Sequence, residues 1–251
     1  MFSLFEFMLA FRYLRARRQE GFISVIAWFS LLGITLGVAT LIIVMSVMNG
    51  FREELLTRIL GLNGHITINA PNGKLYSSEA LIPEIKSIQG VASITKMIEG
   101  QVMVTASGVA QGAVVRAISE IALKNRTIIS NNIQKGDLKN FGTADNLLIG
   151  QRLARKLGVT IGDPITLISP KGLITAFGTV PRMKTYKIAA TFEVGMYEYD
   201  SNFIFMPIKA AKTYFKMPNS ITNLEIFVKN SQETPEIIKN LNQKLGVNYR
   251  I

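Results

Sequence analysis

The sequence contains no cysteine and only one histidine, His65, in 251 residues. Without cysteine the chain cannot form a disulfide-stapled secreted scaffold, a thiolate metal site or a cysteine nucleophile. A single histidine argues against a Ser-His-Asp triad and excludes a multi-histidine metal site within the chain. We therefore expect His65 to have a structural role at the end of a helix.

Charged residues are also scarce, at 18% of the sequence, whereas hydrophobic residues make up 48%. Soluble globular chains typically carry about 25% charged residues. This composition excludes intrinsic disorder, which requires low hydrophobicity and many charges. The charges that are present are unbalanced, with a formal net charge of +11. Such an excess predicts an acidic partner, anionic lipid or nucleic acid.

One long hydrophobic run decides the class of protein. No charged residue occurs from Gly21 to Phe51, a stretch of 31 positions. A membrane-spanning helix needs about 20 apolar residues, so the run predicts a retained transmembrane helix. A cleaved signal peptide, the competing interpretation, has an apolar region of only about 7–15 residues.

The arginines that flank this run predict its orientation. Four lie before it and two lie after it: Arg12, Arg15, Arg17, Arg18, Arg52 and Arg58. Lysine and arginine concentrate on the cytoplasmic side of spanning helices. The N-terminus is therefore expected in the cytoplasm, with the residues after Phe51 outside it. Membrane lipids are then expected partners, and nucleic acid is not.

The N-terminal part divides into two segments. Residues 1–20 are rich in phenylalanine and predict a short helix in the cytoplasmic membrane interface. The helical pattern then continues past the membrane, so residues 21–61 predict one transmembrane and stalk helix, about 60 Å long. Gly33 and Gly37 form a GxxxG pair in it. This pair predicts close packing against a helix of another chain.

The sequence after Gly61 alternates strand and helix patterns, which predicts an α+β domain. Helices are expected over 78–90, 147–158, 208–215 and 234–245. Strands are expected over 65–70, 91–117, 165–168, 186–194, 202–206 and 223–228. The order of these elements favours an outer α+β subdomain, residues 62–110 and 218–251, with a β-rich subdomain, residues 111–217, inserted into it.

No constellation of catalytic or metal-binding residues is evident in this domain. Its acidic residues are scattered singly, and Asp137 and Asp163 lie next to glycine or proline, as turn residues do. The sequence therefore predicts neither an enzyme nor a metal site.

A long connection, residues 169–184, is the strongest candidate for a binding site. It joins two predicted strands that need only a few turn residues. Its apolar side chains have little polar cover: Leu173, Ile174, Phe177, Val180 and Met183. Because exposed apolar tips mark partner sites, we expect this loop to hold another protein. The base of the loop is basic, which would complement an acidic partner. The basic residues are Arg182, Lys184 and Lys187.

Three motifs together resemble the LolC/LolE family of lipoprotein-releasing ABC permeases. The first is Ser46-Val47-Met48-Asn49-Gly50-Phe51 with Leu60-Gly61-Leu62. The second, shared more loosely with MacB-type transporters, is Ile149-Gly150-x-x-Leu153-Ala154-x-x-Leu157-Gly158-Val159-x-x-Gly162-Asp163. The third is Gly195-Met196-Tyr197-Glu198-Tyr199-Asp200-Ser201 with Pro207. The match extends over residues 11–232, most of the chain.

The resemblance implies a MacB-like periplasmic domain with a ferredoxin-like outer subdomain, in a mechanotransmission permease of the bacterial inner membrane. Such a complex extracts lipoproteins from the membrane and passes them to the periplasmic carrier LolA. The implied partners are a LolD-like ATPase, which would hold ATP and Mg, and a second permease subunit that is LolE-like or another copy of this chain. No cofactor is expected in this chain itself.

The long loop resembles the hook with which LolC-like members hold LolA, and LolE-like members are not expected to have it. The chain is therefore expected to be LolC-like, or of the hybrid type that works as a homodimer. The implied hook residues are Leu173, Ile174, Phe177, Gly178, Pro181, Arg182 and Lys184. The resemblance also places lipoprotein against one part of the spanning helix. The residues there are Val44, Met45, Met48 and Phe51.

One departure separates this chain from the family. The family has four spanning helices, whereas this chain ends at Ile251 with one apolar run of spanning length. It is therefore expected to represent the N-terminal portion of such a permease. Alternatives stay open: a single-pass membrane-anchored periplasmic binding or sensor protein, or a permease of the same ABC class with another substrate. A membrane-anchored hydrolase ranks last.

Overall fold

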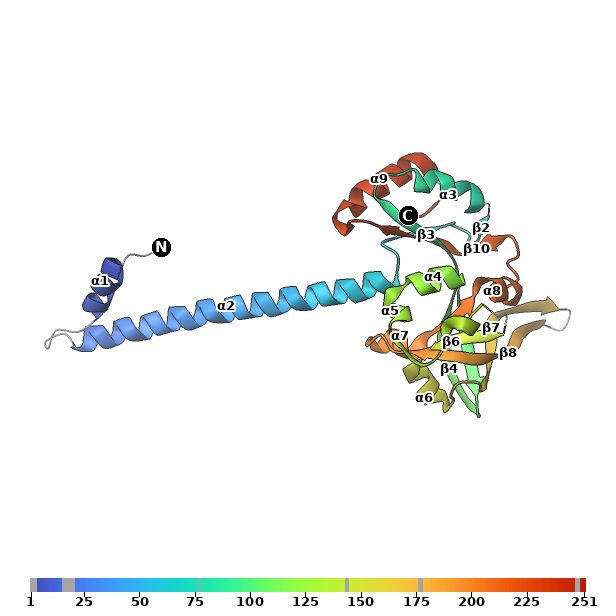
Figure 1. Cartoon of the computed structure of the whole chain (residues 1–251), viewed down its shortest axis with the longest axis horizontal. Helices are drawn as coiled ribbons and strands as arrows, with labels where there is room; N and C mark the ends of the chain where they lie inside the picture. Colours follow the sequence, from blue (N-terminus) through green and yellow to red (C-terminus); the bar gives the residue numbers. More distant parts are fainter. Residues whose placement is uncertain (1–3, 15–20, 77, 143–144, 176–177, 247–248) are drawn as a thin grey trace. The chain divides into compact units, whose positions relative to one another are not determined.

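The computed structural model describes residues 4–14, 21–76, 78–142, 145–175, 178–246 and 249–251. These residues form two compact units, Met1–Thr57 and Arg58–Ile251. The first unit contains helix α1 and most of helix α2, and the second is a mixed domain of strands and short helices (Figure 1).

The first unit is helical in all its described residues. Helix α1 is Leu4–Leu14, and α2 runs without a break over the 42 residues Gly21–Leu62, as the helical pattern predicts. Thr35 and Thr40 each donate a side-chain hydrogen bond to the carbonyl oxygen four residues earlier, at 2.7 and 2.8 Å. These bonds satisfy the hydroxyl groups within an apolar helix. In the described residues, α2 is the one helix long and apolar enough to span a membrane.

The second unit is an α+β domain, which confirms the predicted fold class. Its strands are β1 (Ile66–Asn69), β2 (Leu75–Tyr76), β3 (Val91–Ala106), β4 (Val109–Ile118), β5 (Ile133–Gly136), β6 (Asn146–Gly150), β7 (Pro164–Thr175), β8 (Gly178–Phe192), β9 (Phe203–Pro207), β10 (Ser220–Ile221) and β11 (Asn223–Val228). Its helices are α3 (Ser78–Lys86), α4 (Glu120–Asn125), α5 (Thr127–Ser130), α6 (Gln151–Leu157), α7 (Tyr197–Asn202), α8 (Ile208–Tyr214) and α9 (Thr234–Leu245). Two 3-10 turns complete it, η1 (Leu138–Asn140) and η2 (Ser231–Glu233).

Part of the main sheet closes into a ring. In the described residues, pairing runs from β3 through β4, β9, β6, β8 and β7 and returns to β3. A closed ring leaves no free edge among its own strands. The first half of β3 extends beyond the ring and pairs with β11, where Ile94 lies opposite Ile226. β1 pairs with the other side of β11. Strand β3 therefore belongs both to the ring and to the outer part of the sheet.

Two buried hydrophobic clusters stabilise the domain. The larger connects ring strands with the outer helices through residues such as Val104, Ile188 and Leu241. The second contains Leu62 together with aromatic residues of the ring, and the Phe192 and Phe205 rings meet edge to face at 5.4 Å. A unit with its own buried core can fold as an independent domain. The division of this domain into residues 62–110 with 218–251 and residues 111–217 stays a prediction.

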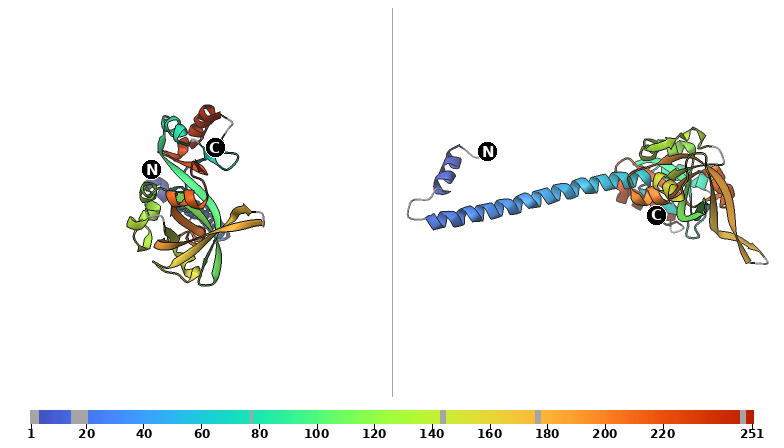
Figure 2. Two further views of the ribbon diagram at one scale, coloured as in Figure 1. Left: turned by 90° about the vertical axis from the view of Figure 1, so that its right-hand side faces the viewer. Right: turned by 90° about the horizontal axis from the view of Figure 1, so that it is seen from below.

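The connection 169–184 is not the loop that we expected. β7 runs to Thr175 and β8 begins at Gly178, so strand pairing continues almost to the tip, with Leu173 opposite Val180. β-branched residues are frequent in this segment and favour extended strands. The result is a long β-hairpin that extends away from the rest of the domain (Figure 2).

The helix expected over 147–158 is wrong in its first part. Asn146–Gly150 forms β6, and helix α6 begins only at Gln151. A short run of buried apolar residues fits a strand as well as a helix, and ring closure here selects the strand. Gly150 marks the change, since a Cβ at this position would lie 2.2 Å from the carbonyl oxygen of Asp200.

Candidate functional site

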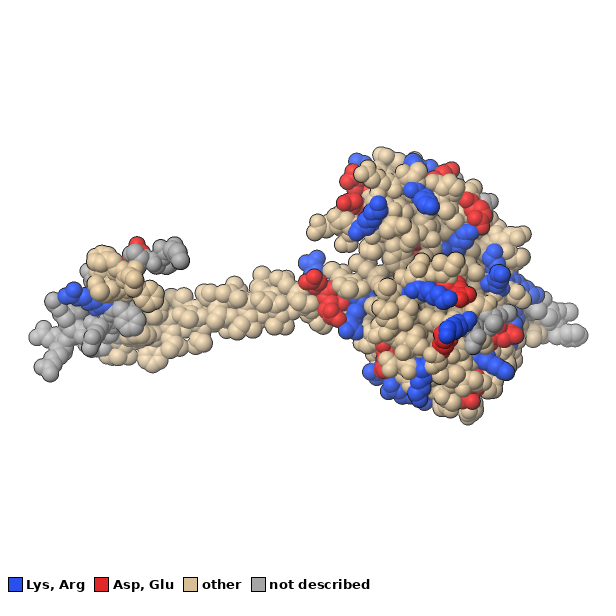
Figure 3. Space-filling view, in the orientation of Figure 1, with Lys and Arg blue, Asp and Glu red and all other residues tan. Residues whose placement is uncertain are grey.

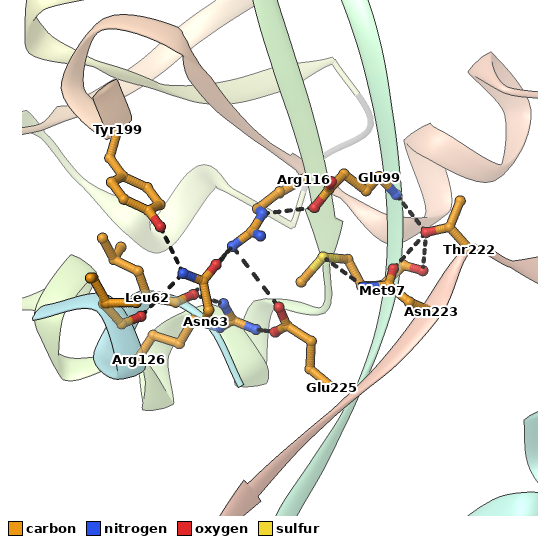
Figure 4. Close-up of polar contacts among 11 residues, drawn as sticks. Leu62, Asn63, Met97, Glu99, Arg116, Arg126, Tyr199, Thr222, Asn223 and Glu225 are labelled. Atoms are coloured by element: carbon orange, nitrogen blue, oxygen red, sulfur yellow. Dashed lines mark hydrogen bonds and ion pairs between the residues drawn. The ribbon is translucent and has the colours of Figure 1, made fainter. Parts of the chain in front are cut away.

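The last turn of α2 belongs to the domain and is bound to it by polar contacts (Figure 4). The final carbonyl groups of a helix have no partner within the helix. Here the carbonyl of the fully buried Leu62 accepts a hydrogen bond from Nη1 of Arg126. One turn earlier, Nη1 of Arg58 donates to the carbonyl of Val194 at 2.7 Å. A cation at this end of a helix also interacts favourably with the helix dipole.

Arg126 is itself buried and paired. Its Nη2 donates to Oε2 of Glu225 in β11, and the two side chains are 3% and 2% exposed. Its guanidinium also lies 5.4 Å from the centre of the Phe227 ring. Burial lowers the pKa of Arg126, and the Glu225 carboxylate opposes that shift. The end of α2 is thereby connected through one arginine to β11.

A second arginine continues this network (Figure 4). Nη1 of Arg116, in β4, donates to Oδ1 of Asn63 at 2.5 Å, and its Nε donates to Oε2 of Glu99 in β3 at 2.9 Å. Nδ2 of Asn63 donates to the hydroxyl of Tyr199 in α7 at 2.7 Å. We call this set the helix-end joint: Arg58, Leu62, Asn63, Arg116, Arg126, Tyr199 and Glu225.

The sequence did not lead us to the helix-end joint, although it contained a signal. Glu225 interrupts the apolar residues 224–228 of β11 and is 1% exposed. Carboxylates are almost never fully buried without a partner, so this residue predicted a buried cation somewhere in the fold. Identifying Arg126 as that cation required the tertiary structure, because 98 residues of chain separate the two.

The predicted carrier-binding residues lie along the β7–β8 hairpin. Phe177 and the side chains of Leu173 and Ile174 lie outside the part of the chain that is described. Gly178 begins β8 with a φ of 112°, a conformation that favours glycine. Pro181 is exposed. Its neighbours Val180 and Met183 are 53% and 63% exposed, so apolar surface is present on the described part of β8.

The basic residues at the hairpin base contact their own domain. Nη1 of Arg182 donates to the carbonyl of Tyr214 at 2.5 Å. Nζ of Lys184 lies 3.2 Å from a carboxylate oxygen of Asp145 and 4.9 Å from the centre of the Tyr186 ring. Burial raises the pKa of Tyr214 to about 12 and also raises that of Tyr186. Both phenols therefore stay neutral at physiological pH, and the lysine interacts with an uncharged ring.

The residues singled out in the spanning helix are accessible in this unit. Four side chains on α2 are 54–60% exposed: Val44, Met45, Met48 and Phe51. A Cβ added at Gly33 or Gly37 would meet no atom within 4 Å. These positions therefore have free space around them in the described chain, where another helix or a lipid can pack.

In the described residues, no group of three or more histidine or acidic side chains could hold a metal ion. His65 instead meets Phe227 edge to face at 6.0 Å, and its Nδ1 accepts from the Val228 amide at 3.4 Å. Asp137 and Asp163, the two acidic residues predicted in turns, accept hydrogen bonds from backbone amides two and three residues away. Oδ1 of Asp137 accepts from the Lys139 amide, and Oδ2 of Asp163 accepts from the Thr160 amide.

Known proteins similar to this chain include two transmembrane proteins of lipoprotein-releasing systems. LolC of Neisseria meningitidis is 28% identical over 96% of the chain, and LolC of Xylella fastidiosa is 27% identical over all of it. These relatives confirm the resemblance that the motifs predicted. The chain spans 58% and 60% of their respective lengths.

A solved structure and a family model show which fold and which family the domain has. The extracellular domain of the ABC-type transporter YknZ from Gram-positive bacteria superposes with a TM-score of 0.50 at 13% identity, covering 74% of this chain and 97% of that one. This likeness concerns the fold. The model of the MacB-like periplasmic core domain matches residues 27–244, which include most of α2 and nearly the whole domain. The chain belongs to the MacB-like periplasmic core domain family.

Proposed function

We propose that this chain forms the N-terminal part of a permease subunit in an ATP-driven complex that releases lipoproteins from the bacterial inner membrane. The observation that carries the proposal is the similarity to LolC, which extends through both the apolar helix and the domain. A LolD-like ATPase would bind ATP and Mg in the cytoplasm. The N-terminal side of α2 would lie in the same compartment. A second permease subunit, LolE-like or another copy of this chain, would complete the pair, and a LolA-like carrier would receive the lipoprotein.

The β7–β8 hairpin is the surface that we assign to the carrier. Val180 and Met183 expose apolar side chains on β8, and Leu173 lies opposite Val180 in the register. Burying one large apolar side chain contributes about 1.5–3 kcal/mol, so a few of them can supply much of a micromolar interface. The closed ring from which the hairpin extends would hold it in position for binding.

The test is capture of a purified LolA-like carrier by the domain, residues 58–251. Deletion of 172–179 should abolish capture while circular dichroism stays unchanged, because a short turn can rejoin the two strands. The point variant Met183→Asp should weaken capture at least tenfold. The matched control is Val109→Asp, since Val109 is 38% exposed beside the turn of another hairpin. Full capture by the folded deletion variant would refute the carrier assignment.

For the lipoprotein itself we infer a path along α2. Val44, Met48 and Phe51 follow one another at spacings of four and three residues, which places them on one face of the helix, and Met45 lies beside them. Methionine is unbranched and adapts to varied acyl chains. A photo-crosslinker at Met48 in the complete complex should capture lipoprotein. Capture of permease subunits alone would assign this face to helix packing instead.

We further infer that the helix-end joint passes movement between α2 and the domain. Its support is the density of directed contacts on the last turn of α2, in which two arginines bind Leu62 and Asn63 and are themselves paired with carboxylates. A helix end held in this way can move the strands that hold it, because the buried charges resist separation.

A further inference from the structure

The motif Gly195-Met196-Tyr197-Glu198-Tyr199-Asp200-Ser201 belongs neither to the carrier surface nor to the lipoprotein path. It forms the end of the connection that follows β8 and nearly all of helix α7, beside the last turn of α2. Figure 3 shows acidic side chains on the surface of the domain, whereas Asp200 is 0% exposed. A buried carboxylate needs hydrogen-bond partners or a cation, so the partners of Asp200 indicate what this segment does.

Both carboxylate oxygens of Asp200 accept hydrogen bonds from the start of the segment. Oδ1 accepts from the Val194 amide at 2.8 Å, and Oδ2 accepts from the Gly195 amide at 3.1 Å. The Asp200 amide in turn donates to the carbonyl of Met196 at 3.0 Å. Residues 194–200 are therefore closed by the side chain and the amide of one residue, which fixes the direction of the Val194 carbonyl.

The Val194 carbonyl is the acceptor for Arg58 of α2, at 2.7 Å from Nη1. Gly195 has a φ of 78°, which favours glycine, and a Cβ there would lie 2.5 Å from Nη1 of Arg58. The segment thus offers both an acceptor and the space for the guanidinium. Removing the Asp200 carboxylate would take the acceptor from two backbone amides, which favours another arrangement of the segment.

The other end of the segment holds a second residue of the helix end. The Tyr199 hydroxyl accepts from Nδ2 of Asn63 at 2.7 Å (Figure 4), and the Tyr199 ring stacks on that of Phe203 in β9 at 4.7 Å. The Asn63 amide donates to the carbonyl of Ile59 at 2.9 Å, so Asn63 continues the helical turn. Successive residues of an α-helix are about 100° apart, which places Arg58 and Asn63 about 140° apart around the axis.

We infer that residues 194–200 form a clamp that fixes the rotation of the last turn of α2 about its own axis, with Asp200 as the positioning residue. A single hydrogen bond would let the helix roll around the bonded side chain. Two bonds about 140° apart, made by one closed segment, oppose rolling in both directions. A twist of α2 would therefore turn the strand ring with it. The inference concerns how the domain holds this helix end, and it does not depend on lipoprotein release.

The test uses the full chain, residues 1–251, in lipid nanodiscs. The chain has no cysteine, so spin labels can be attached at two introduced cysteines, Glu53→Cys on α2 and Lys209→Cys on α8. The label at position 53 lies off the helix axis, so rotation of α2 changes its distance from the domain. Double electron–electron resonance should give one narrow distance distribution for this labelled parent chain. Asp200→Ala should broaden the distribution at least twofold.

Two further variants separate the clamp from general stability. Tyr199→Phe removes only the hydroxyl that accepts from Asn63, so it should broaden the distribution while the circular dichroism spectrum stays unchanged. Asp163→Ala is the matched control, because Oδ2 of Asp163 accepts from the Thr160 amide at 2.8 Å in another turn, and the width should not change. Three results would overturn the inference: a broad distribution in the parent chain, a parental width in folded Asp200→Ala or Tyr199→Phe, or equal broadening by Asp163→Ala.

Discussion

At the scale of single residues, Arg126 and Glu225 form the most buried ion pair described in the domain, with side chains 3% and 2% exposed. Removing Arg126 would leave the buried Glu225 carboxylate with Arg116 alone, 3.9 Å away, and breaking a buried pair typically costs about 3–5 kcal/mol. Arg126→Met should therefore lower the free energy of unfolding of residues 58–251 by about that amount. Urea unfolding followed by circular dichroism measures it.

The control for this prediction is the surface pair Lys124–Glu120, whose side chains are 52% and 38% exposed. Lys124→Ala should cost less than about 1 kcal/mol, as exposed pairs do. The double variant Arg126→Met with Glu225→Leu should regain part of the lost stability, since no unpaired charge then remains. Equal losses for Arg126→Met and Lys124→Ala would contradict the role of burial.

His65 gives a prediction about pH, because the chain has one histidine and its titration can be isolated. Burial lowers the pKa of His65 below its ordinary value of 6.5 in the folded domain. As pH falls from 7 through 6.5 and below, the unfolded chain takes up a proton more readily than the folded one. The stability that His65 contributes is thus fully present above pH 6.5 and decreases as pH falls.

The measurement is urea unfolding of the wild type and of His65→Gln at several pH values between 5 and 7.5. Subtracting the variant's free energy of unfolding from that of the wild type cancels the titration of all other groups. That difference should decrease toward acidic pH. A constant difference would show that His65 takes up its proton equally well in both states.

At the scale of elements, α2 has the clearest consequence. It continues past its apolar run to Leu62 in one helix. Proline within a helix removes a hydrogen bond and kinks it, at a cost of about 3 kcal/mol or more. If α2 transmits movement, Leu56→Pro in the complete complex should reduce lipoprotein release at least tenfold while ATP hydrolysis persists. Leu56→Ala is the matched control and should release normally, and unchanged release by Leu56→Pro would refute transmission through this helix.

Elements also show what the sequence could predict. The long apolar run and the unbroken helical spacing predicted α2 correctly, since these patterns are local. The apolar residues of 147–150 were assigned to a helix, because short buried strands and helices share that pattern. They form β6 because a strand is needed between β8 and β9 in the ring. The short helices α4, α5 and α7 have too few residues for a periodic signal and were not predicted.

The candidate sites divide in the same way. The hairpin was noticed because the connection was too long and too apolar for a turn, which is a local property. Its strand pairing depends on the register of Leu173 with Val180, and a loop and a hairpin of the same composition look alike in sequence. The helix-end joint combines residues of α2, β4, α7 and β11 with Arg126, and only the fold brings them together.

At the scale of the whole molecule, the arginines before the apolar run still predict a cytoplasmic N-terminus. Alkaline phosphatase fused after Gly61 should therefore be active, because this enzyme requires export from the cytoplasm. A green fluorescent protein fused at the same position and exported in unfolded form should stay dark. Bright fluorescence with an inactive phosphatase would reverse the orientation.

The closed ring has a mechanical consequence. At the base of the hairpin, the residues Thr166 to Ile168 of β7 are paired on both sides, with β3 and with β8. A pull along the hairpin would load several backbone hydrogen bonds at once, in shear, whereas a strand at an open edge would peel away one bond at a time. If the hairpin holds the carrier that we propose, the sheet behind it would therefore stay paired when the carrier is pulled.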